Sequence, residues 1–228
     1  TNFDTLSLHD ALPISRFSSI VVISRRPTRL AERFGALVVE RVVTDMQPAR
    51  LRKAVLAALS DVDHEVLGFS VLGIGAGTAK LTIDQHRAVD VELNAAFAAG
   101  LKDSGKVRHL AFMSAIGADP EARTTGSGAA GMPRYARVKG ESEQAVIRHG
   151  PEVVSVFRPS VIVGSQHTPR ALATSLSLLS PLLPKRYRPI SCAEIARAMV
   201  AISLSAPRHS AVYAYAEMQT AATGADTA

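Results

Sequence analysis

Strand-like apolar runs alternate with helix-like stretches along this 228-residue chain, and this alternation constrains the fold more than any other feature. The apolar runs cover Ile20–Ser24, Leu37–Thr44, Glu65–Leu72, Val107–Ser114 and Val153–Phe157. Strands that alternate with helices indicate βαβ units and a parallel sheet. Because crossovers between such strands are right-handed, helices come to lie on both faces of the sheet. We therefore expect one doubly wound α/β domain.

The helix-like stretches carry recognisable signals at their ends. We expect helices over Pro48–Leu59, Asp84–Ala99, Tyr135–His149 and Ser191–Leu204. A proline opens the first of them, Gly100 and Gly150 close the second and third, and a capping box formed by Ser191 and Glu194 opens the fourth. The pattern predicts a Rossmann-like domain over residues 16–217, with a small substrate-side region at 165–190 and a disordered tail at 218–228.

Composition argues against several classes of function. The net charge is +6, but the arginines are scattered, and four Tyr, seven Phe and no Trp leave little for base stacking, so we expect no nucleic-acid partner. No apolar run reaches the roughly 18–20 residues that span a bilayer. The single cysteine, Cys192, allows no intrachain disulfide and fits the cytoplasm. No Cys/His cluster has metal-ligand spacing, so we expect no metal, and a monomer and a homodimer both stay open.

Ligands of doubly wound sheets bind at the carboxyl ends of the strands, so residues that follow each strand are informative. Arg25 and Arg26 follow the first strand, where arginine can pair with the 2′-phosphate of NADP; two solvated arginines are the alternative. Asp45 follows the second strand and can meet an adenine amino group. Leu72 and Gly73 end the third, and a glycine there allows close approach of a cofactor.

The segment GIGAG after the third strand lacks the G-x-G-x-x-G spacing and follows the wrong strand for a phosphate cradle. Ser114 ends the fourth strand, while Pro159 and Ser160 follow the fifth. If the sheet is a single one, Arg25, Gly73, Ser114 and Pro159 should lie along one rim.

Tyr135 and Lys139 are one helical turn apart and share one face of the helix predicted over Tyr135–His149. An unperturbed tyrosine has a pKa of about 10, and a nearby ammonium favours the phenolate and lowers that pKa. The lysine can also hydrogen-bond a ribose. YxxxK is common by chance, but its position between two predicted strands of this fold favours an acid–base pair.

Together these segments resemble the short-chain dehydrogenase/reductase superfamily in its extended or atypical branch. The resemblance is carried by VVISRR, HLAFMSAIGAD, YARVKGESE and VFRPSVIVG, and it covers roughly residues 16–204. In detail the segments resemble bacterial relatives of the Tat-interactive protein, an NADPH-binding atypical member of the superfamily.

The resemblance implies an NADP(H)-dependent oxidoreductase, with NAD as the alternative cofactor and a small carbonyl or alcohol as substrate. Tyr135 would be the general acid–base and Lys139 the ribose ligand. Arg25 and Arg26 would bind the 2′-phosphate. Asp45, Leu72 and Gly73 would surround the adenosine, and Pro159 and Ser160 would border the nicotinamide. A non-catalytic, NADPH-sensing regulatory protein with the same fold is the second hypothesis.

The chain departs from the superfamily pattern in its catalytic serine. Close relatives often have Ser-Ser where this chain has Ser114-Ala115. If the second residue of that pair is the catalytic one, an alanine replaces it, and Ser114 is only a strand-end hydroxyl. This departure favours the regulatory hypothesis, whereas the intact Tyr135 and Lys139 favour the enzyme.

The beginning of the chain also departs from the superfamily. Superfamily members begin with a strand, a G-x-x-G-x-x-G loop and a helix, and nothing of the kind precedes Ile20. Leu6–Ile14 is what the codons CTT TCC CTA CAC GAC GCT CTT CCG ATC encode, a string that resembles a sequencing-adapter oligonucleotide. We therefore interpret residues 1–15 as a non-native leader; a natural leader is the alternative. The expected consequences are a missing strand beside Ile20–Ser24 and weak cofactor binding.

Overall fold

The computed structural model describes residues 17–75, 77–163 and 184–224, so the predicted leader and residues 165–183 of the predicted substrate-side region lie outside them. The strands are β1 (Ile20–Ser24), β2 (Val38–Val42), β3 (Val66–Ser70), β4 (Val107–Met113), β5 (Val153–Phe157), β6 (Ile162–Val163), β7 (Ile190–Ser191) and β8 (Ala211–Tyr213). The longer helices are α3 (Pro48–Leu59), α5 (Asn94–Asp103), α6 (Pro133–His149), α8 (Cys192–Leu204) and α9 (Tyr215–Gly224). The short ones are α2 (Leu30–Phe34), η2 (Gly35–Leu37), η3 (Thr78–Lys80), α4 (Ile83–Arg87), η4 (Ala88–Leu93) and η6 (Lys185–Tyr187).

A four-stranded parallel sheet in the order β3-β4-β5-β8 forms the centre of the fold. β1 pairs with β2 and β6 pairs with β7, also in parallel. Parallel strands need crossover connections, and here helices provide most of them. The predicted Rossmann-like α/β class, with a parallel sheet in a single domain, is confirmed.

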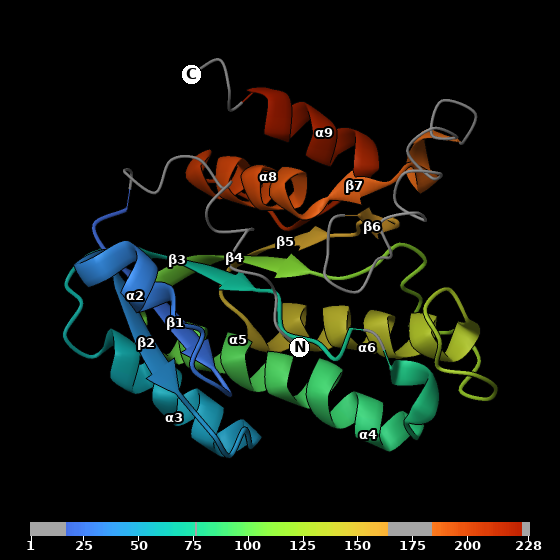
Figure 1. Ribbon diagram of the computed structural model, residues 1–228, viewed down its shortest axis with the longest axis horizontal. Helices are drawn as coiled ribbons and strands as arrows, with labels where there is room; N and C mark the ends of the chain where they lie inside the picture. The colour runs from blue at the N-terminus through green and yellow to red at the C-terminus, as the bar shows by residue number, and fades with distance from the viewer. Residues whose placement is uncertain (1–16, 76, 164–183, 225–228) are drawn as a thin grey trace.

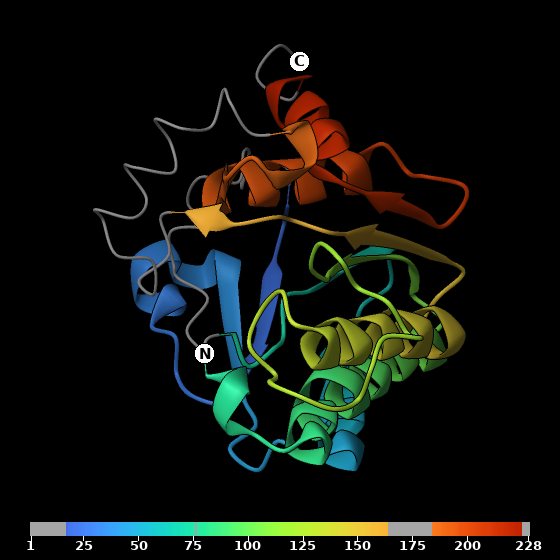
Figure 2. The same ribbon diagram turned by 90° about the vertical axis from the view of Figure 1, so that its right-hand side faces the viewer.

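Helices cover both faces of the central sheet. Figures 1 and 2 show α8 and α9 above it and α3, α5 and α6 below it. Successive side chains of β4 point to opposite faces: Leu110 and Phe112 join the cluster with α3 and α5, whereas Ala111 and Met113 join the cluster with α8 and α9. All five residues of β5 are buried, as expected for a strand covered on both sides.

The helix predicted over Asp84–Ala99 continues past Gly100, so the expected stop at this glycine is wrong. A stretch of π-helix, η4, joins α4 to α5, and α5 runs on to Asp103. A Cβ at position 100 would lie 2.9 Å from the Val55 Cβ, so the glycine allows α3 and α5 to pack closely. Gly105, with a φ of +68°, follows the true end of the helix.

Residues 218–224 belong to α9, so the disordered tail predicted over 218–228 is wrong for these residues, and residues 225–228 lie outside the described part of the chain. In α9, Met218 and Ala222 are buried against α8 and the apolar face of β4 and β5. The segment looks unstructured in the sequence because alanines and threonines form most of it, yet small side chains suit close packing between helices. None of the described helices has the length and apolar character needed to cross a membrane.

The parallel arrangement is interrupted between β1 and β3. β1 pairs only with β2, β3 pairs only with β4, and no strand in the described part of the chain joins their other edges. None of the five residues of β1 is fully buried, and Val21 is 39% exposed although the strand reads IVVIS. Gly73, Ser114 and Pro159 therefore follow strands of one sheet, whereas Arg25 follows a strand of another, and the expectation of one continuous rim is wrong for Arg25.

We predict that the interruption accepts one more parallel strand. Replacing residues 1–15 by a strand–GxxGxxG–helix unit should pair the free edges of β1 and β3 and raise Tm. A gain of about 2 kcal/mol would raise Tm by roughly 4–8 °C in a chain of this size. Hydrogen exchange should slow in residues 20–24 and 66–70. The control carries a proline in the middle of the grafted strand, and unchanged exchange in both segments would contradict the prediction.

Candidate active site

The two residues of the YxxxK pattern lie in the first half of α6. Pro133 occupies the first turn of this helix, where its missing N–H has no intrahelical partner to lose. Tyr135 is half-buried, and Lys139, one turn further along, is only 8% exposed. The Lys139 Nζ lies 5.7 Å from the centroid of the Tyr135 ring. The helix therefore holds an ammonium directly beside a phenol.

The Lys139 ammonium is paired with a carboxylate that we did not predict from the sequence. Its Nζ lies 2.5 Å from the Oδ1 of Asp90, which belongs to η4 and is 1% exposed. The Asp90 Oδ2 accepts a hydrogen bond from the Ile74 backbone N–H at 3.2 Å, and the Nε2 of His86 lies 3.6 Å from it. Both charges of the pair are thus removed from bulk water.

A polar stripe of three buried residues, His86, Asp90 and Asn94, holds the loop after β3 over this pair. The Asn94 side-chain amide donates to the backbone carbonyls of Asp90 and Leu72, and its Oδ1 accepts from the Ser70 hydroxyl at 2.6 Å. The three residues are spaced i, i+4, i+8 and share one helix face, and this spacing could have identified the stripe from the sequence. A polar helix face, however, is typical of one exposed to solvent, so the sequence alone does not indicate that these residues are buried.

Two glycines allow the backbone to approach α6 closely. A Cβ at Gly73 would lie 3.2 Å from the Asp90 Oδ1 and 3.4 Å from the Lys139 Nζ, so the loop backbone lies directly against the ion pair. A Cβ at Gly140 would overlap the backbone of Asp119 and Pro120. Leu72, Gly73, Tyr135 and Lys139, all predicted from the sequence, therefore gather at one place.

Burial and nearby charges shift the pKa values of Tyr135, Lys139 and Asp90, and the pKa of Tyr135 shifts in the direction opposite to the one predicted from the sequence. Burial raises the pKa of Tyr135; the Lys139 ammonium opposes this change, and the Asp90 carboxylate adds to it. The expected lowering of the Tyr135 pKa by Lys139 is therefore wrong as a net effect. Although burial lowers the pKa of Lys139, attraction to Asp90 outweighs it and raises that pKa overall. Burial raises the pKa of Asp90, but contacts with His86 and Lys139 lower it overall.

Ser114 lies at the end of β4, but its hydroxyl is engaged away from Tyr135. It donates to the Glu143 Oε1 at 2.5 Å, and Glu143 lies two helical turns beyond Tyr135 on α6. Arg158 binds the same carboxylate through two nitrogens, with Nε at 2.8 Å and Nη2 at 2.5 Å. The serine is thus part of a buried hydrogen-bonded cluster with Glu143 and Arg158.

The remaining predicted residues divide between two places. Arg25 and Arg26 are exposed at the end of β1, and Asp45 forms an ion pair with Arg50 at 3.2 Å on the same side of the molecule. Near β5, the Pro159 carbonyl accepts from the Ile116 N–H at 2.9 Å, and the Ser160 hydroxyl donates to the Arg188 carbonyl. Residues expected near the two ends of a dinucleotide thus belong to separate sheets.

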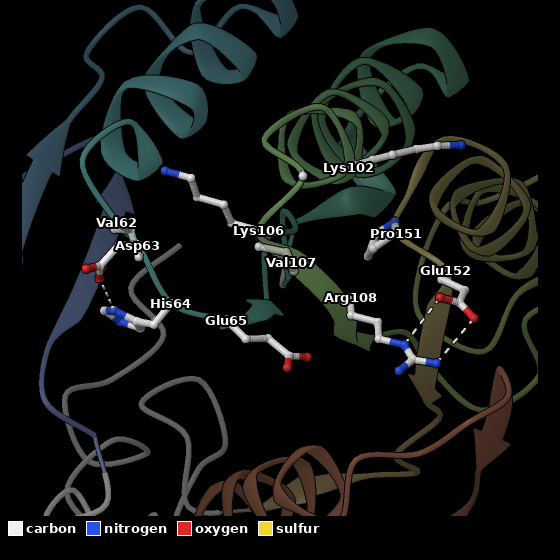
Figure 3. Close-up of a pocket in the computed structure, with 11 residues that line it drawn as sticks. Val62, Asp63, His64, Glu65, Lys102, Lys106, Val107, Arg108, Pro151 and Glu152 are labelled. Carbon is white, nitrogen blue, oxygen red and sulfur yellow. Dashed lines mark hydrogen bonds and ion pairs between the residues drawn. The ribbon is translucent and has the colours of Figure 1, made fainter.

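An open pocket of about 610 Å³ lies at the opposite, amino-terminal ends of β3, β4 and β5 (Figure 3). Its charged groups are largely satisfied by neighbours. Arg108 pairs with Glu152 at 3.2 Å, His64 contacts Asp63 at 3.1 Å, and the Lys106 ammonium donates to the Leu59 carbonyl at 2.7 Å. None of the predicted site residues lines it, so it is not the candidate active site.

Comparison with known proteins shows the fold. No protein-family profile matches this chain, and no curated protein matches it. Solved structures match with TM-scores above 0.5. L-sorbose reductase from Gluconobacter frateurii, complexed with NADPH and L-sorbose, has a TM-score of 0.59 at 16% identity, covering 92% of this chain and 90% of that one.

Two further structures show the same similarity. A short-chain dehydrogenase from Streptomyces avermitilis has a TM-score of 0.57 at 13% identity, covering 97% of this chain and 88% of that one. MoeE5 in complex with UDP-glucose and NAD has a TM-score of 0.57 at 12% identity, with coverages of 90% and 73%. The chain therefore shares the Rossmann-like α/β fold of these three structures.

We predict that Gly140→Ala destabilises the protein, because the new methyl group meets the backbone of Asp119 and Pro120 rather than a side chain that can move. Overpacking of this kind costs about 1–3 kcal/mol. Denaturant unfolding measures the loss, with Gln144→Ala on the exposed face of α6 as the control. Equal stability of the two variants would show that α6 does not need this close approach.

Proposed function

We propose that this chain is an NADP(H)-dependent oxidoreductase of the atypical short-chain type, acting on a small carbonyl or alcohol. The observation that carries the proposal is the Tyr135 phenol beside the Lys139 ammonium on α6, next to the loop that follows β3. Solved structures with this fold include one complexed with NADPH and one complexed with NAD.

The residues on the Lys139 side fit a nicotinamide nucleotide. The ammonium has three N–H donors, and Asp90 takes one of them at 2.5 Å, which leaves two for the hydroxyls of a ribose. Gly73 has no side chain between the loop and the ion pair, so the loop backbone lies directly beside the ammonium that would bind the ribose. Arg25 and Arg26 would hold the 2′-phosphate from the end of β1. Nothing in the described residues between β1 and β3 would hold the pyrophosphate.

In this proposal, NADPH held by Lys139 and the two arginines would supply the hydride that reduces the substrate carbonyl. Tyr135 donates its phenolic proton to the carbonyl oxygen, which becomes the hydroxyl of the alcohol product, and solvent returns a proton to the phenolate. Because burial raises the pKa of Tyr135, the phenol is protonated at neutral pH and suits the reducing direction. Lys139 orients the ribose beside it.

The second candidate, a non-catalytic NADPH-sensing protein, is favoured by one observation. Ser114 donates its hydroxyl to Glu143, and the following residue is Ala115, so the described chain offers no free serine hydroxyl at the end of β4 for a substrate carbonyl. Turnover separates the two candidates, because a sensor would bind NADPH without reducing any carbonyl.

We predict that Tyr135→Phe reduces the turnover of a panel of small carbonyl compounds by about 10²–10⁴-fold, the usual contribution of a general acid. NADPH binding should be retained, because the ring stays in place. The parent rate should fall as pH rises through the pKa of Tyr135, since the phenolate cannot donate a proton. Absorbance of NADPH measures the rates. An equal rate in the variant, or no turnover by the parent despite bound NADPH, would favour the sensor.

We also predict that Arg25 and Arg26 select NADP over NAD. Removing a bidentate charged contact costs about 1.5–3 kcal/mol, so Arg25→Ala/Arg26→Ala should weaken NADPH binding roughly ten- to hundredfold and leave NADH binding unchanged. Calorimetry on the chain and on its strand-grafted form measures both affinities. The control, Arg148→Ala/Arg208→Ala, removes the same charge from exposed positions outside β1 and β2. Equal affinities for the two nucleotides, unaffected by the first substitution pair, would contradict the assignment.

A further inference from the structure

Asp90 is a buried charged group that the proposed reaction does not use. Its side chain is 1% exposed, and its two oxygens have separate partners: Oδ1 contacts the Lys139 ammonium at 2.5 Å, and Oδ2 accepts from the Ile74 N–H at 3.2 Å. Its backbone carbonyl accepts from Ser142 and from Asn94. Lys139 from α6 and Ile74 from the loop after β3 thus fix the carboxylate, while Ser142 from α6 and Asn94 from α5 fix the backbone that carries it.

The helix that carries Asp90 is distorted where the residue sits. η4 is a stretch of π-helix between α4 and α5, and such stretches are frequent at functional sites. One turn before it, His86 is 1% exposed, its ring lies 5.7 Å from the Tyr135 ring, and neither of its ring nitrogens makes a hydrogen bond within the described residues. The Tyr135 ring thus lies beside the turn of α4 that directly precedes the π-helical stretch carrying Asp90.

The electrostatic consequence follows from the geometry. The Asp90 carboxylate on η4 raises the pKa of the Tyr135 phenol, whereas the Lys139 ammonium lowers it. Glu143, on α6, is the second carboxylate that raises the pKa of Lys139. A cation and an anion 2.5 Å apart have a much weaker field at a third group than either charge alone. Lys139 therefore cannot act on Tyr135 as an isolated positive charge.

We propose that Asp90 is a positioning residue for the Tyr135–Lys139 pair: its carboxylate fixes the ammonium against Gly73 and cancels most of the positive charge that the phenol would otherwise face. The pair then keeps Tyr135 as a protonated donor and leaves two Lys139 N–H groups aimed away from Asp90. The catalytic meaning of this role rests on the proposed function, whereas the coupling among the three side chains does not.

The test is a pH titration of Tyr135 followed by NMR of the chain labelled with ¹³Cζ-tyrosine, without cofactor or substrate. The chain has four tyrosines, and Tyr135→Phe identifies the resonance. Asp90→Asn should move the titration of Tyr135 to lower pH, because Lys139 then acts unopposed. Lys139→Met should move it to higher pH. The double variant, which lacks both charges, should titrate close to the parent.

Each outcome decides the proposal. An unshifted or upward-shifted titration in Asp90→Asn would overturn it, and so would a double variant that titrates like Lys139→Met. If Asp90→Asn does not fold because it leaves the lysine unpaired, the comparison of the double variant with Lys139→Met still decides. Asp84→Asn, an exposed carboxylate on α4, serves as the control and should leave the titration unchanged. Absent turnover would overturn the proposed function but leave this result standing.

Discussion

A charged lysine that is almost completely buried needs a counter-charge, and this need connects most of the structure around the candidate site. The Lys139–Asp90 pair joins α6 to η4, and Asp90 in turn binds the backbone at Ile74. Breaking such a pair by removing one partner typically costs about 3–5 kcal/mol, because the other charge stays buried. The loop after β3, the π-helical turn and the first half of α6 therefore hold their positions together. The site is organised around this pair rather than around a single catalytic residue.

A second constraint comes from the sheet. β4 and β5 are buried on both faces, whereas β1 is apolar but partly exposed and lacks a described partner on the side of β3. An apolar strand with an unpaired edge loses both hydrogen bonds and burial, and such edges promote association with other strands. The two sheets thus differ in how many of their backbone N–H and C=O groups are hydrogen-bonded to a neighbouring strand. The central sheet supports Tyr135, Lys139 and Ser114, so this part of the site does not depend on β1.

The sequence predicted β1 to β5 and the helices α3, α5, α6 and α8 because their signals are local, but it did not predict the short strands β6, β7 and β8. Pro48–Leu59, Val153–Phe157 and the Ser191 capping box appear where predicted, with proline, apolar runs and cap residues acting within one or two turns. Gly100 and α9 were misjudged because their roles depend on contacts with Val55 and α8. Asp90 was missed for the same reason: its partner lies 49 residues away, and only tertiary packing makes its charge a buried one. The roles of the site residues stay predictions, although their grouping around Lys139 was anticipated in part.

Helix α6 carries a second buried charge, and this explains how its orientation is fixed. Glu143 lies one turn beyond Lys139 and binds Arg158 and Ser114 at the ends of β5 and β4. Lys139 and Glu143 thus tie one helix to two different neighbours, η4 on one side and the strand ends on the other. With Gly140 between them packed against Pro120, the helix can neither rotate nor slide without breaking an ion pair or a close contact. Because these anchors join α6 to η4 and to the ends of β4 and β5, Tyr135 and Lys139 are held independently of Arg25 and Arg26 after β1. A dinucleotide that contacted both Lys139 and these arginines would therefore connect β1 with the central sheet, between which the described residues show no strand pairing.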